Sequence, residues 1–373
     1  MQDAGDDARW MARALELAAR GDWRTRPNPR VGAVLVREGQ LLAEGWHQVA
    51  GGPHAEAAAL AALAAAGGDP REATLYLNLE PCGPFPGKRT PPCVEALLGA
   101  RLARVVVAQE DPHPAVAGRS LARLRAAGVA VERGLLEREA RRLNGPWNRA
   151  LEGGLPWVTA KWAMSLDGKI AARGGDSRWI SGEASRRRAH ALRGEVDAVL
   201  VGSGTALADD PLLTRRDAPG GDPLRVVLDA RGRLPQESRL VATAREHPLL
   251  VCAGPGASAE HLLELQARGA AVCALPPGPA GGLDLDALLR ELRRREVRHL
   301  LVEGGSRVLG AFFAAGRVDQ VVCFLAPKLL GGDAAPGPLG GAGVDAVARA
   351  LPLEGLSAEP CGEDLVISGW VAR

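Results

Sequence analysis

Three side chains with the chemistry of zinc ligands stand in order in the first third of the 373-residue chain: His54, Cys82 and Cys93. One imidazole and two thiolates form a donor set that suits Zn²⁺. Three protein ligands leave the fourth tetrahedral position to water, which is the open geometry of a catalytic site. A structural site would close with a fourth Cys or His, and the neighbouring sequence has none at ligand spacing. The pattern therefore predicts a catalytic zinc site.

The elements expected around these residues favour the same chemistry. His54 and Cys93 each open a predicted helix directly after a proline, and Cys82 follows a predicted strand. Helix N-termini carry partial positive charge, which favours a thiolate over a thiol. Glu56 follows His54 by two residues, near the metal without sharing its direction. We assign Glu56 the role of a proton shuttle, which takes a proton from the metal-activated water and delivers it to a leaving amine.

Each of these motifs has a plainer explanation when it stands alone. A His-x-Glu pair on a helix is most often a surface pair, and a single cysteine is most often a small core residue. Their combination in this order, each next to the end of an element, points to zinc-dependent hydrolysis. The four histidines of the second half have no partner at ligand spacing: His190, His247, His261 and His299.

Strands and helices alternate along the chain, which predicts two layered α/β domains. The first domain has expected strands at 31–36, 41–47, 73–79, 104–108 and 129–132, and helices at 54–67, 93–100 and 120–127. The second has expected strands at 158–163, 198–201, 224–228, 249–252, 299–303 and 320–325, and helices at 182–193, 260–268, 285–295 and 306–315. Gly, Pro and Asn cluster at 144–156, the candidate linker, and we place the boundary between 148 and 149. Residues 331–343 read as a surface loop.

Composition excludes several classes of protein. The net charge is +2 and aromatic residues are 3% of the chain, so neither a basic nor a ring-stacking surface for nucleic acid is expected. No segment reaches the roughly 20 apolar residues of a membrane helix. The acidic start, MQDAGDDARW, lacks the pattern of a secretory signal, and six cysteines do not form a disulfide scaffold. A cytoplasmic protein with reduced thiols is therefore expected.

The HAE…PC…C pattern resembles the zinc-dependent nucleoside and nucleobase deaminases. The usual spacing between their cysteines is two residues, whereas ten separate Cys82 from Cys93 here. A long loop ending in RTPPC is typical of the deaminase domain of the bifunctional deaminase–reductases of riboflavin biosynthesis. By this resemblance Asn28, in PNPRVG, and Arg89, just before TPPC, contact the substrate. The loop is longer than is usual in that family, and Lys88 competes with Arg89 for this role.

The second half resembles the reductase domain of the same family, which has a dihydrofolate-reductase-like fold. The matching segments are KWAMSLDGK at 161–169, SRWIS at 177–181, GTALADDPLLT at 204–214, VEGG at 302–305 and APKLLG at 326–331. The resemblance thus covers nearly the whole chain. It implies a cytidine-deaminase-like three-layer α/β/α domain at 1–148, followed by a dihydrofolate-reductase-like α/β domain at 149–373.

The resemblance also implies the residues of the reductase site. NADPH would contact Ala163, Trp179, Thr205, Asp209, Gly305, Ser306, Arg307, Val308, Leu309, Gly310 and Ala311. The ribose phosphate substrate would contact Ser177, Arg193, Leu213, Arg216 and Glu303. No GxGxxG fingerprint is present, so NADPH rests on the resemblance alone. The two arginines suit phosphate, because a guanidinium fork binds it bidentately.

The implied activity is a pair of reactions that uses Zn²⁺ and NADPH. Zinc-dependent hydrolysis would deaminate 2,5-diamino-6-(5-phosphoribosylamino)pyrimidin-4-one, and NADPH would then reduce the ribosyl group to a ribityl side chain. A homo-oligomer, a dimer or a tetramer, is expected. Two alternatives remain open at this point. One is a deaminase of the same fold with another substrate, fused to an unrelated nucleotide-binding domain. The other is a structural zinc module on a nucleotide-binding regulator, which chelation would unfold.

Overall fold

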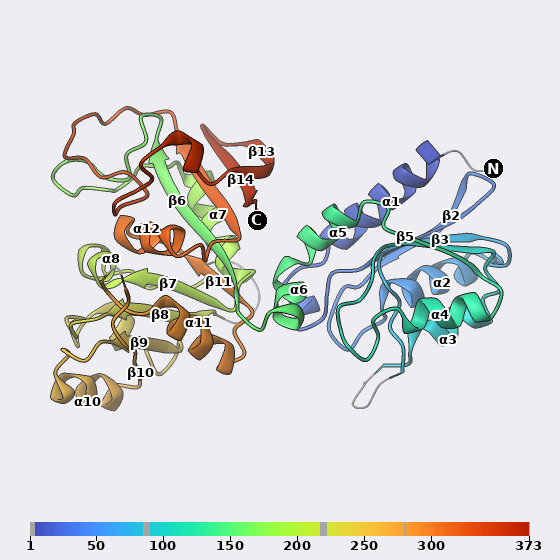
Figure 1. Ribbon diagram of the computed structural model, residues 1–373, viewed down its shortest axis with the longest axis horizontal. Coiled ribbons are helices and arrows are strands. Elements are labelled where there is room, and N and C mark those ends of the chain that lie inside the picture. Colours follow the sequence, from blue (N-terminus) through green and yellow to red (C-terminus); the bar gives the residue numbers. More distant parts are fainter. Residues whose placement is uncertain (1–3, 85–89, 217–221, 280, 373) are drawn as a thin grey trace. The chain divides into compact units, whose positions relative to one another are not determined.

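The computed structural model describes residues 4–84, 90–216, 222–279 and 281–372. The chain divides into two compact units, Met1–Gly154 and Leu155–Arg373 (Figure 1). The boundary between them lies beyond the expected one at 148/149, because the candidate linker is partly helical. Helix α6 (Gly145–Glu152) forms there with Pro146 in its first turn, where the missing N–H of proline leaves no hydrogen bond unmade.

A five-stranded sheet forms the middle of the first unit. Its strands are β1 (Gly32–Arg37), β2 (Gln40–Trp46), β3 (Thr74–Leu79), β4 (Arg104–Gln109) and β5 (Ala130–Arg133). They lie in the order β2-β1-β3-β4-β5. Strand β1 is antiparallel to β2 and β3, whereas β3, β4 and β5 are parallel. Strand β3 is buried along its whole length, so helices cover the sheet on both sides.

Alternate residues of these strands face two separate cores. One core holds Leu75 and Leu77 and includes the apolar sides of α2 (Ala55–Ala65), α3 (Cys93–Gly99) and α4 (Arg119–Ala126). The other holds Tyr76 and the apolar sides of α1 (Ala4–Ala19) and α5 (Glu137–Leu143). The first unit therefore has the predicted three-layer α/β/α arrangement. Helix α1 was not expected, although its buried Trp10, Met11, Ala14 and Leu17 recur at helical spacing.

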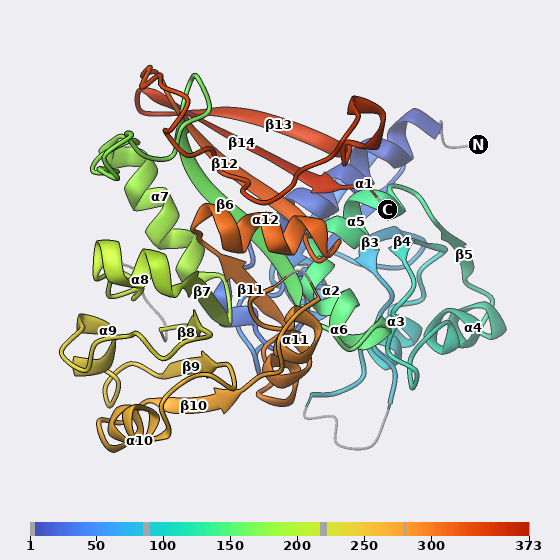
Figure 2. The same cartoon turned by 60° about the vertical axis from the view of Figure 1, so that its left-hand side comes forward.

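A nine-stranded sheet forms the second unit, in the order β10-β9-β8-β7-β11-β6-β12-β14-β13 (Figure 2). Its strands are β6 (Trp157–Ser165), β7 (Ala198–Gly202), β8 (Leu224–Asp229), β9 (Leu249–Ala253), β10 (Ala271–Ala274), β11 (His299–Val302), β12 (Gln320–Ala326), β13 (Leu353–Cys361) and β14 (Asp364–Val371). The run from β10 to β12 is parallel, and β14 and β13 follow as an antiparallel pair. Neither β10 nor the β13–β14 hairpin was expected from the sequence. Strand β13 is almost wholly exposed, so it shows no apolar alternation.

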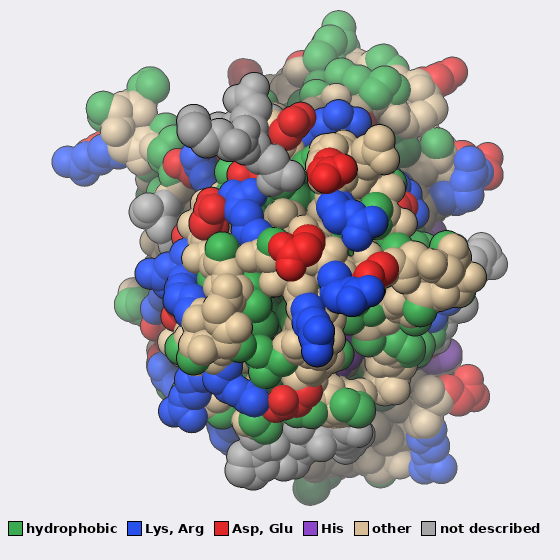
Figure 3. Space-filling model, turned by 90° about the vertical axis from the view of Figure 1, so that its right-hand side faces the viewer, with side chains coloured by type: hydrophobic (Ala, Val, Ile, Leu, Met, Phe, Trp, Pro, Cys, Tyr) green, Lys and Arg blue, Asp and Glu red, His purple; other side chains and the backbone are tan. Residues whose placement is uncertain are grey.

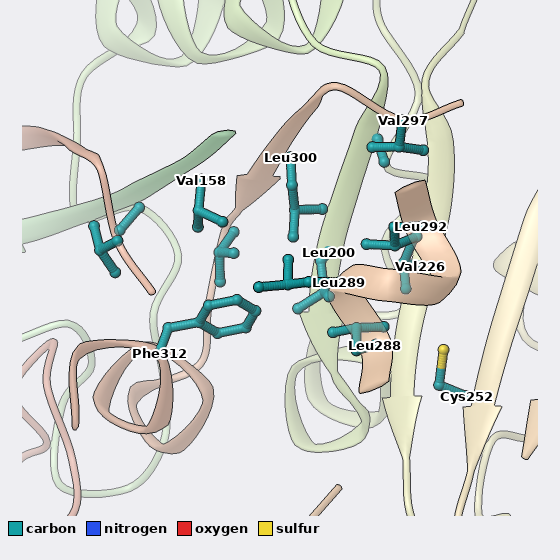
Figure 4. Packing of buried hydrophobic residues seen from close by; sticks show 14 of the residues in the cluster. Val158, Leu200, Val226, Cys252, Leu288, Leu289, Leu292, Val297, Leu300 and Phe312 are labelled. Carbon is teal, nitrogen blue, oxygen red and sulfur yellow. The ribbon is translucent and has the colours of Figure 1, made fainter. Parts of the chain in front are cut away.

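Helices cover both faces of the parallel part. They are α7 (Glu183–Gly194), α8 (Ser203–Asp209), α9 (Arg239–Ala242), α10 (Ala259–Ala267), α11 (Leu285–Arg294) and α12 (Ser306–Ala314), with single 3₁₀ turns at Trp23–Thr25 in the first unit and Val347–Arg349 in the second. Figure 4 shows one of the cores, in which Leu288, Leu289 and Leu292 of α11 and Phe312 of α12 pack on the strands. A second core includes apolar residues of α8, α9 and α10, and a smaller third one includes Phe324 of β12 and Ala189 of α7.

The surface charge and the helices bear on the same two classes of protein as the composition, nucleic-acid-binding proteins and membrane proteins. The face seen in Figure 3 carries acidic and basic side chains interspersed, with no field of one sign. Among the described residues, no helix combines the length and the apolar character that crossing a bilayer needs.

Candidate active sites

The three predicted zinc ligands lie together in the first unit. The sulfurs of Cys82 and Cys93 are each 3.4 Å from Nδ1 of His54. The three donor atoms all lie within 4.8 Å of one another. Zinc bonds of about 2.3 Å to sulfur and about 2.1 Å to nitrogen, at a tetrahedral angle, separate S from N by about 3.6 Å. The spacing therefore fits one zinc ion held by these three atoms.

Local structure aims each donor at the same point. His54 caps the start of α2, and Cys93 is the first residue of α3. Cys82 lies just after β3, where its sulfur accepts the backbone N–H of Cys93 at 3.3 Å. A sulfur that accepts an N–H at a helix start is favoured as thiolate, the form that binds metal. The Oγ1 of Thr90 lies 3.3 Å from the other ring nitrogen of His54 and restrains the ring.

Glu56 lies in the first turn of α2 with its side chain buried beside the ligands. Its Oε2 has no hydrogen-bond partner among the described residues. Burial first, and then the charge of Cys82, raises the pKa of Glu56 to about 7. A buried carboxyl group with one uncommitted oxygen next to a metal site has the position and the proton affinity of a proton carrier.

Asn28 is linked to the ligand set through a residue that sequence analysis did not single out. Its amide Nδ2 lies 3.1 Å from Nε2 of His47, and Nδ1 of His47 lies 2.9 Å from the carbonyl of Pro53. The carbonyl fixes the ring proton on Nδ1, so Nε2 accepts from the Asn28 amide. The rings of His47 and His54 are in edge contact. The signal for His47 was its place in the GWHQ stretch before the HAE motif. Arg89, with Lys88, lies outside the described residues.

Glu80, two residues before Cys82, was given no role by the sequence analysis. Its buried carboxylate accepts the backbone N–H groups of Asp111, Gly118, Ser120 and Leu121 at 2.8–3.3 Å. These contacts fix the start of α4 against the end of β3, two residues before Cys82. Burial raises the pKa of Glu80. A buried carboxyl needs such partners, and here they lie 31–41 residues further along the chain, where sequence spacing does not reveal them.

A cluster of buried charges forms the centre of the predicted reductase site. Nε and Nη2 of Arg193, on α7, donate to the two carboxylate oxygens of Glu303 at 2.6 and 2.9 Å. Nζ of Lys161, on β6, lies 3.6 Å from the same carboxylate. Burial alone would raise the pKa of Glu303, but the charges of Arg193 and Lys161 lower it to about 2. Glu303 is therefore an ionised carboxylate with fixed orientation.

Arg193 is engaged within the protein. Its Nη1 also donates to the carbonyl of Thr214 at 3.1 Å and contacts Nδ1 of His190 at 3.3 Å. The fork that was expected to hold phosphate thus holds Glu303. Arg216, the second arginine expected at the phosphate, is exposed. Lys161 and His190 are the members of this cluster that sequence analysis missed. The only signal for His190 was its spacing of one helical turn from Arg193.

A buried arginine, Arg225, holds the start of the segment that carries Leu213 and Arg216. The Arg225 guanidinium donates to the carbonyls of Leu212, Leu240, Thr243, His247 and Pro248 and to the Thr243 hydroxyl. Leu213 is buried in the core with φ of 55°. The side chain of Leu213 therefore belongs to the packing of this segment.

Two turns of the predicted cofactor site lie side by side. Helix α8 begins after β7 and helix α12 after β11, and these strands are parallel neighbours. The N–H of Gly202 donates to the carbonyl of Gly304 at 3.0 Å, and a Cβ on Gly305 would lie 3.0 Å from Oγ1 of Thr205. Helix starts at the carboxyl ends of adjacent parallel strands favour an anionic ligand. Thr205 and Gly305 thus share one site, with Ser306 next in the chain.

Other residues expected at NADPH differ in burial, from the core to the surface. Leu309 is buried in the core, and Gly310 faces the loop at 331–343, where a Cβ would lie 1.8 Å from the carbonyl oxygen of Gly340. Trp179 is 62% exposed, and its carbonyl accepts from Nζ of Lys328 at 2.7 Å. The remaining expected NADPH contacts are half-buried or exposed: Ala163, Asp209, Arg307, Val308 and Ala311. Ser177, expected at the ribose phosphate, is half-buried.

Comparison with known proteins follows the same division of the chain. Residues 4–109 match the cytidine and deoxycytidylate deaminase zinc-binding region, and residues 156–367, more than half of the chain, match the RibD C-terminal domain. The riboflavin biosynthesis protein RibD of Aquifex aeolicus is 40% identical over 97% of both chains. The chain belongs to the RibD family. RibD of Escherichia coli is 39% identical over 88% of this chain and 89% of its own.

Solved RibD structures share the fold over the full length. Acinetobacter baumannii RibD superimposes with a TM-score of 0.79 at 36% identity and covers 100% of both chains. A Thermotoga maritima diaminohydroxyphosphoribosylaminopyrimidine deaminase/5-amino-6-(5-phosphoribosylamino)uracil reductase gives 0.79 at 32% identity and covers 99% of both. The expected deaminase-like and dihydrofolate-reductase-like folds are confirmed. The chain is a RibD-type enzyme of riboflavin biosynthesis with a zinc-dependent deaminase domain and an NADPH-dependent reductase domain. The RibD match over 156–367 rules out both alternatives, an unrelated second domain and a regulator.

Proposed function

We propose that this chain deaminates diaminohydroxyphosphoribosylaminopyrimidine and then reduces 5-amino-6-(5-phosphoribosylamino)uracil, the two reactions named for the Thermotoga maritima relative. The observation that carries the proposal is the group formed by His54, Cys82 and Cys93 with the uncommitted Oε2 of Glu56 beside it. Three donor atoms at zinc spacing next to a buried proton carrier match the hydrolytic removal of an amino group from a ring.

For the deamination we assign each role to a side chain. When bound, zinc lowers the pKa of its water ligand and so supplies a nucleophile at neutral pH. Glu56 relays the two protons of that water in turn at Oε2, the first to the ring nitrogen next to the attacked carbon and the second to the amino group, which then leaves as ammonia. The Asn28 amide, held by His47, orients the pyrimidine. We keep Arg89 as a substrate contact by family resemblance.

For the reduction, NADPH supplies the hydride and the protein supplies position and charge. The paired starts of α8 and α12, with Thr205 and Gly305, bind the anionic part of the cofactor. The ionised Glu303 carboxylate, fixed by Arg193 and Lys161, faces the sugar as a hydrogen-bond acceptor. Arg216 binds the sugar phosphate, because Arg193 is already engaged. Apart from Leu213, Leu309 and Gly310, which pack within the protein, the remaining family-matched contacts stand as assigned by resemblance.

The test follows ammonia and NADPH absorbance separately after the pyrimidine substrate is added. Glu56→Gln should retain zinc and lower ammonia release by about 10²–10⁴-fold, since it removes the proton carrier and keeps the shape. The control is Glu95→Gln, an exposed residue of the neighbouring α3 that pairs with Arg123. Ammonia release by Glu56→Gln at the wild-type rate would remove Glu56 from the mechanism. No ammonia release by the wild-type enzyme would overturn the proposal.

We also propose that the chain acts in the cytoplasm as a homo-oligomer, a dimer or a tetramer. None of the six cysteines, all of which the structure describes, forms a disulfide, which suits a reducing compartment. Exposed apolar side chains gather in and next to the β13–β14 hairpin: Val347, Leu351, Leu353, Leu356 and Leu365. An edge strand with such side chains is normally covered. Light scattering should give a multiple of the chain mass for the wild type and a smaller species for Leu356→Glu. A wild-type monomer would contradict the proposal.

A further inference from the structure

His190 lies among charges from four different segments of the reductase unit. Arg193 is one turn further along α7, Lys161 projects from β6, Arg216 lies after α8, and Glu303 directly follows β11. Three of these groups are cations and one is an anion. The charges nearest to the imidazole thus sum to a positive value, which opposes the protonation of His190.

The donors of Arg193 define what His190 must offer. Nε and Nη2 are committed to Glu303, and Nη1 faces both the carbonyl of Thr214 and Nδ1 of His190. A guanidinium has only N–H donors and no acceptor. Nδ1 of His190 must therefore present its lone pair, and the ring proton must sit on Nε2. Burial, followed by the charge of Arg193, lowers the pKa of His190 to about 4, in agreement with a neutral ring.

We propose that His190 is a positioning residue for the reduction, which as a neutral Nε2–H imidazole holds one edge of Arg193 so that the opposite edge stays bidentate on Glu303. The Arg193 side chain has several rotatable bonds, and two parallel contacts to one carboxylate leave the pair free to swing together. The contacts of Nη1 with His190, one turn earlier on the same helix, and with the carbonyl of Thr214, on a different segment, remove that freedom. The inference rests on the proposed function, in which Glu303 faces the sugar.

The experiment compares two amides that place an acceptor at different points. In His190→Asn the side-chain oxygen reaches the place of Nδ1, whereas in His190→Gln the terminal amide reaches the place of Nε2. We expect Asn to keep reductase kcat within about threefold of wild type, and Gln and Leu to lower it by about 10–100-fold, as for a displaced catalytic group. Ammonia release, measured on the same preparations, should be unchanged in all three.

Outcomes for the two proposals are separable. A wild-type enzyme without NADPH oxidation would contradict the proposed function. If the wild-type enzyme is active and His190→Leu has the same reductase kcat, only the role of His190 is overturned. A Gln variant as active as Asn would also overturn it, because a packing role does not depend on which ring atom is replaced.

A second measurement needs no active variant. Nitrogen-15 NMR of the wild-type histidine rings should show one ring, absent from His190→Asn, that is neutral at pH 6 with its proton on Nε2. In Arg193→Lys the same ring should titrate closer to the ordinary histidine pKa, since a close cation and its hydrogen bond are displaced. A His190 ring that is protonated at pH 6 in the wild type would overturn the proposal.

Discussion

The candidate sites of the two halves hold their buried polar groups in opposite ways. In the deaminase unit His54, Cys82 and Cys93 turn their donor atoms toward one another, and Glu56 keeps an oxygen that no described residue contacts by a hydrogen bond. In the reductase unit the carboxylate of Glu303 is matched by Arg193 and Lys161. The first arrangement is completed by a cation from solution, whereas the second is complete within the chain. Loss of the ion should therefore silence one half, and loss of a single side chain should destabilise the other.

The largest effect is expected from a ligand of the deaminase unit. His54→Ala should lose its zinc and reduce ammonia release to background, because two thiolates alone hold the ion weakly. NADPH oxidation with the deaminated substrate should continue at the wild-type rate. Metal analysis and the two assays check this, with His113→Ala as the control that keeps its zinc. Loss of both activities would show that the halves depend on each other.

A smaller effect, on stability, is expected from the reductase cluster. Glu303→Gln leaves the buried Arg193 and Lys161 without their anion, which costs about 3–5 kcal/mol for broken buried pairs. The calorimetric transition of the reductase unit should fall, and NADPH oxidation should be lost. The exposed Glu264→Gln serves as the control. An unchanged unfolding temperature would mean that solvent stabilises the two cations, which would contradict the view that the reductase cluster is complete within the chain.

The packing beside the cofactor turn gives a third test. A Cβ at Gly310 would lie 1.8 Å from the Gly340 carbonyl oxygen, a backbone atom that cannot turn away. Gly310→Ala should therefore destabilise the reductase unit by about 1–3 kcal/mol and raise KM for NADPH, because the start of α12 must move. Gly256→Ala, which meets nothing within 4 Å, is the matched control. Equal behaviour of the two variants would contradict the close contact.

The smallest effect concerns pH. Folding lowers the pKa of His190 from 6.5 to about 4, so between these values the unfolded chain binds a proton that the folded chain excludes. The stabilisation is complete above about pH 6.5 and is lost as the pH falls toward 4. His190→Asn should lack this part of the acid destabilisation. Melting temperatures of the reductase unit at several pH values check it, and parallel curves for the two proteins would contradict it.

The metal site could be predicted from the sequence because its ligand residue types lie next to the ends of helices and strands. His54, Glu56 and Cys93 stand at helix starts that prolines announce, so order along the chain approximated position in space. The fold followed from alternating strands and helices. Strand β13 was not predicted because an exposed edge strand has no alternation of apolar and polar residues. Helix α6 was not predicted because its proline and glycine are typical of a linker.

The reductase cluster was out of reach for a different reason. Arg193 and Glu303 are 110 residues apart, and only the parallel pairing of β11 with β6 brings Lys161 to the same carboxylate. Family resemblance named Arg193 and Glu303 as substrate contacts, but it did not reveal that each is the other's partner. Which residues pair in space depends on the order of the strands in the sheet, and a local sequence pattern does not reveal that order.

The Glu80 carboxylate has a consequence for how this scaffold tolerates change. Because it gathers four amides from the stretch that leads into α4, that stretch and the strand that delivers Cys82 behave as one mechanical piece. Insertions or deletions there are not absorbed at the surface. They should change the orientation of the Cys82 sulfur, so the length of this surface connection matters for metal binding.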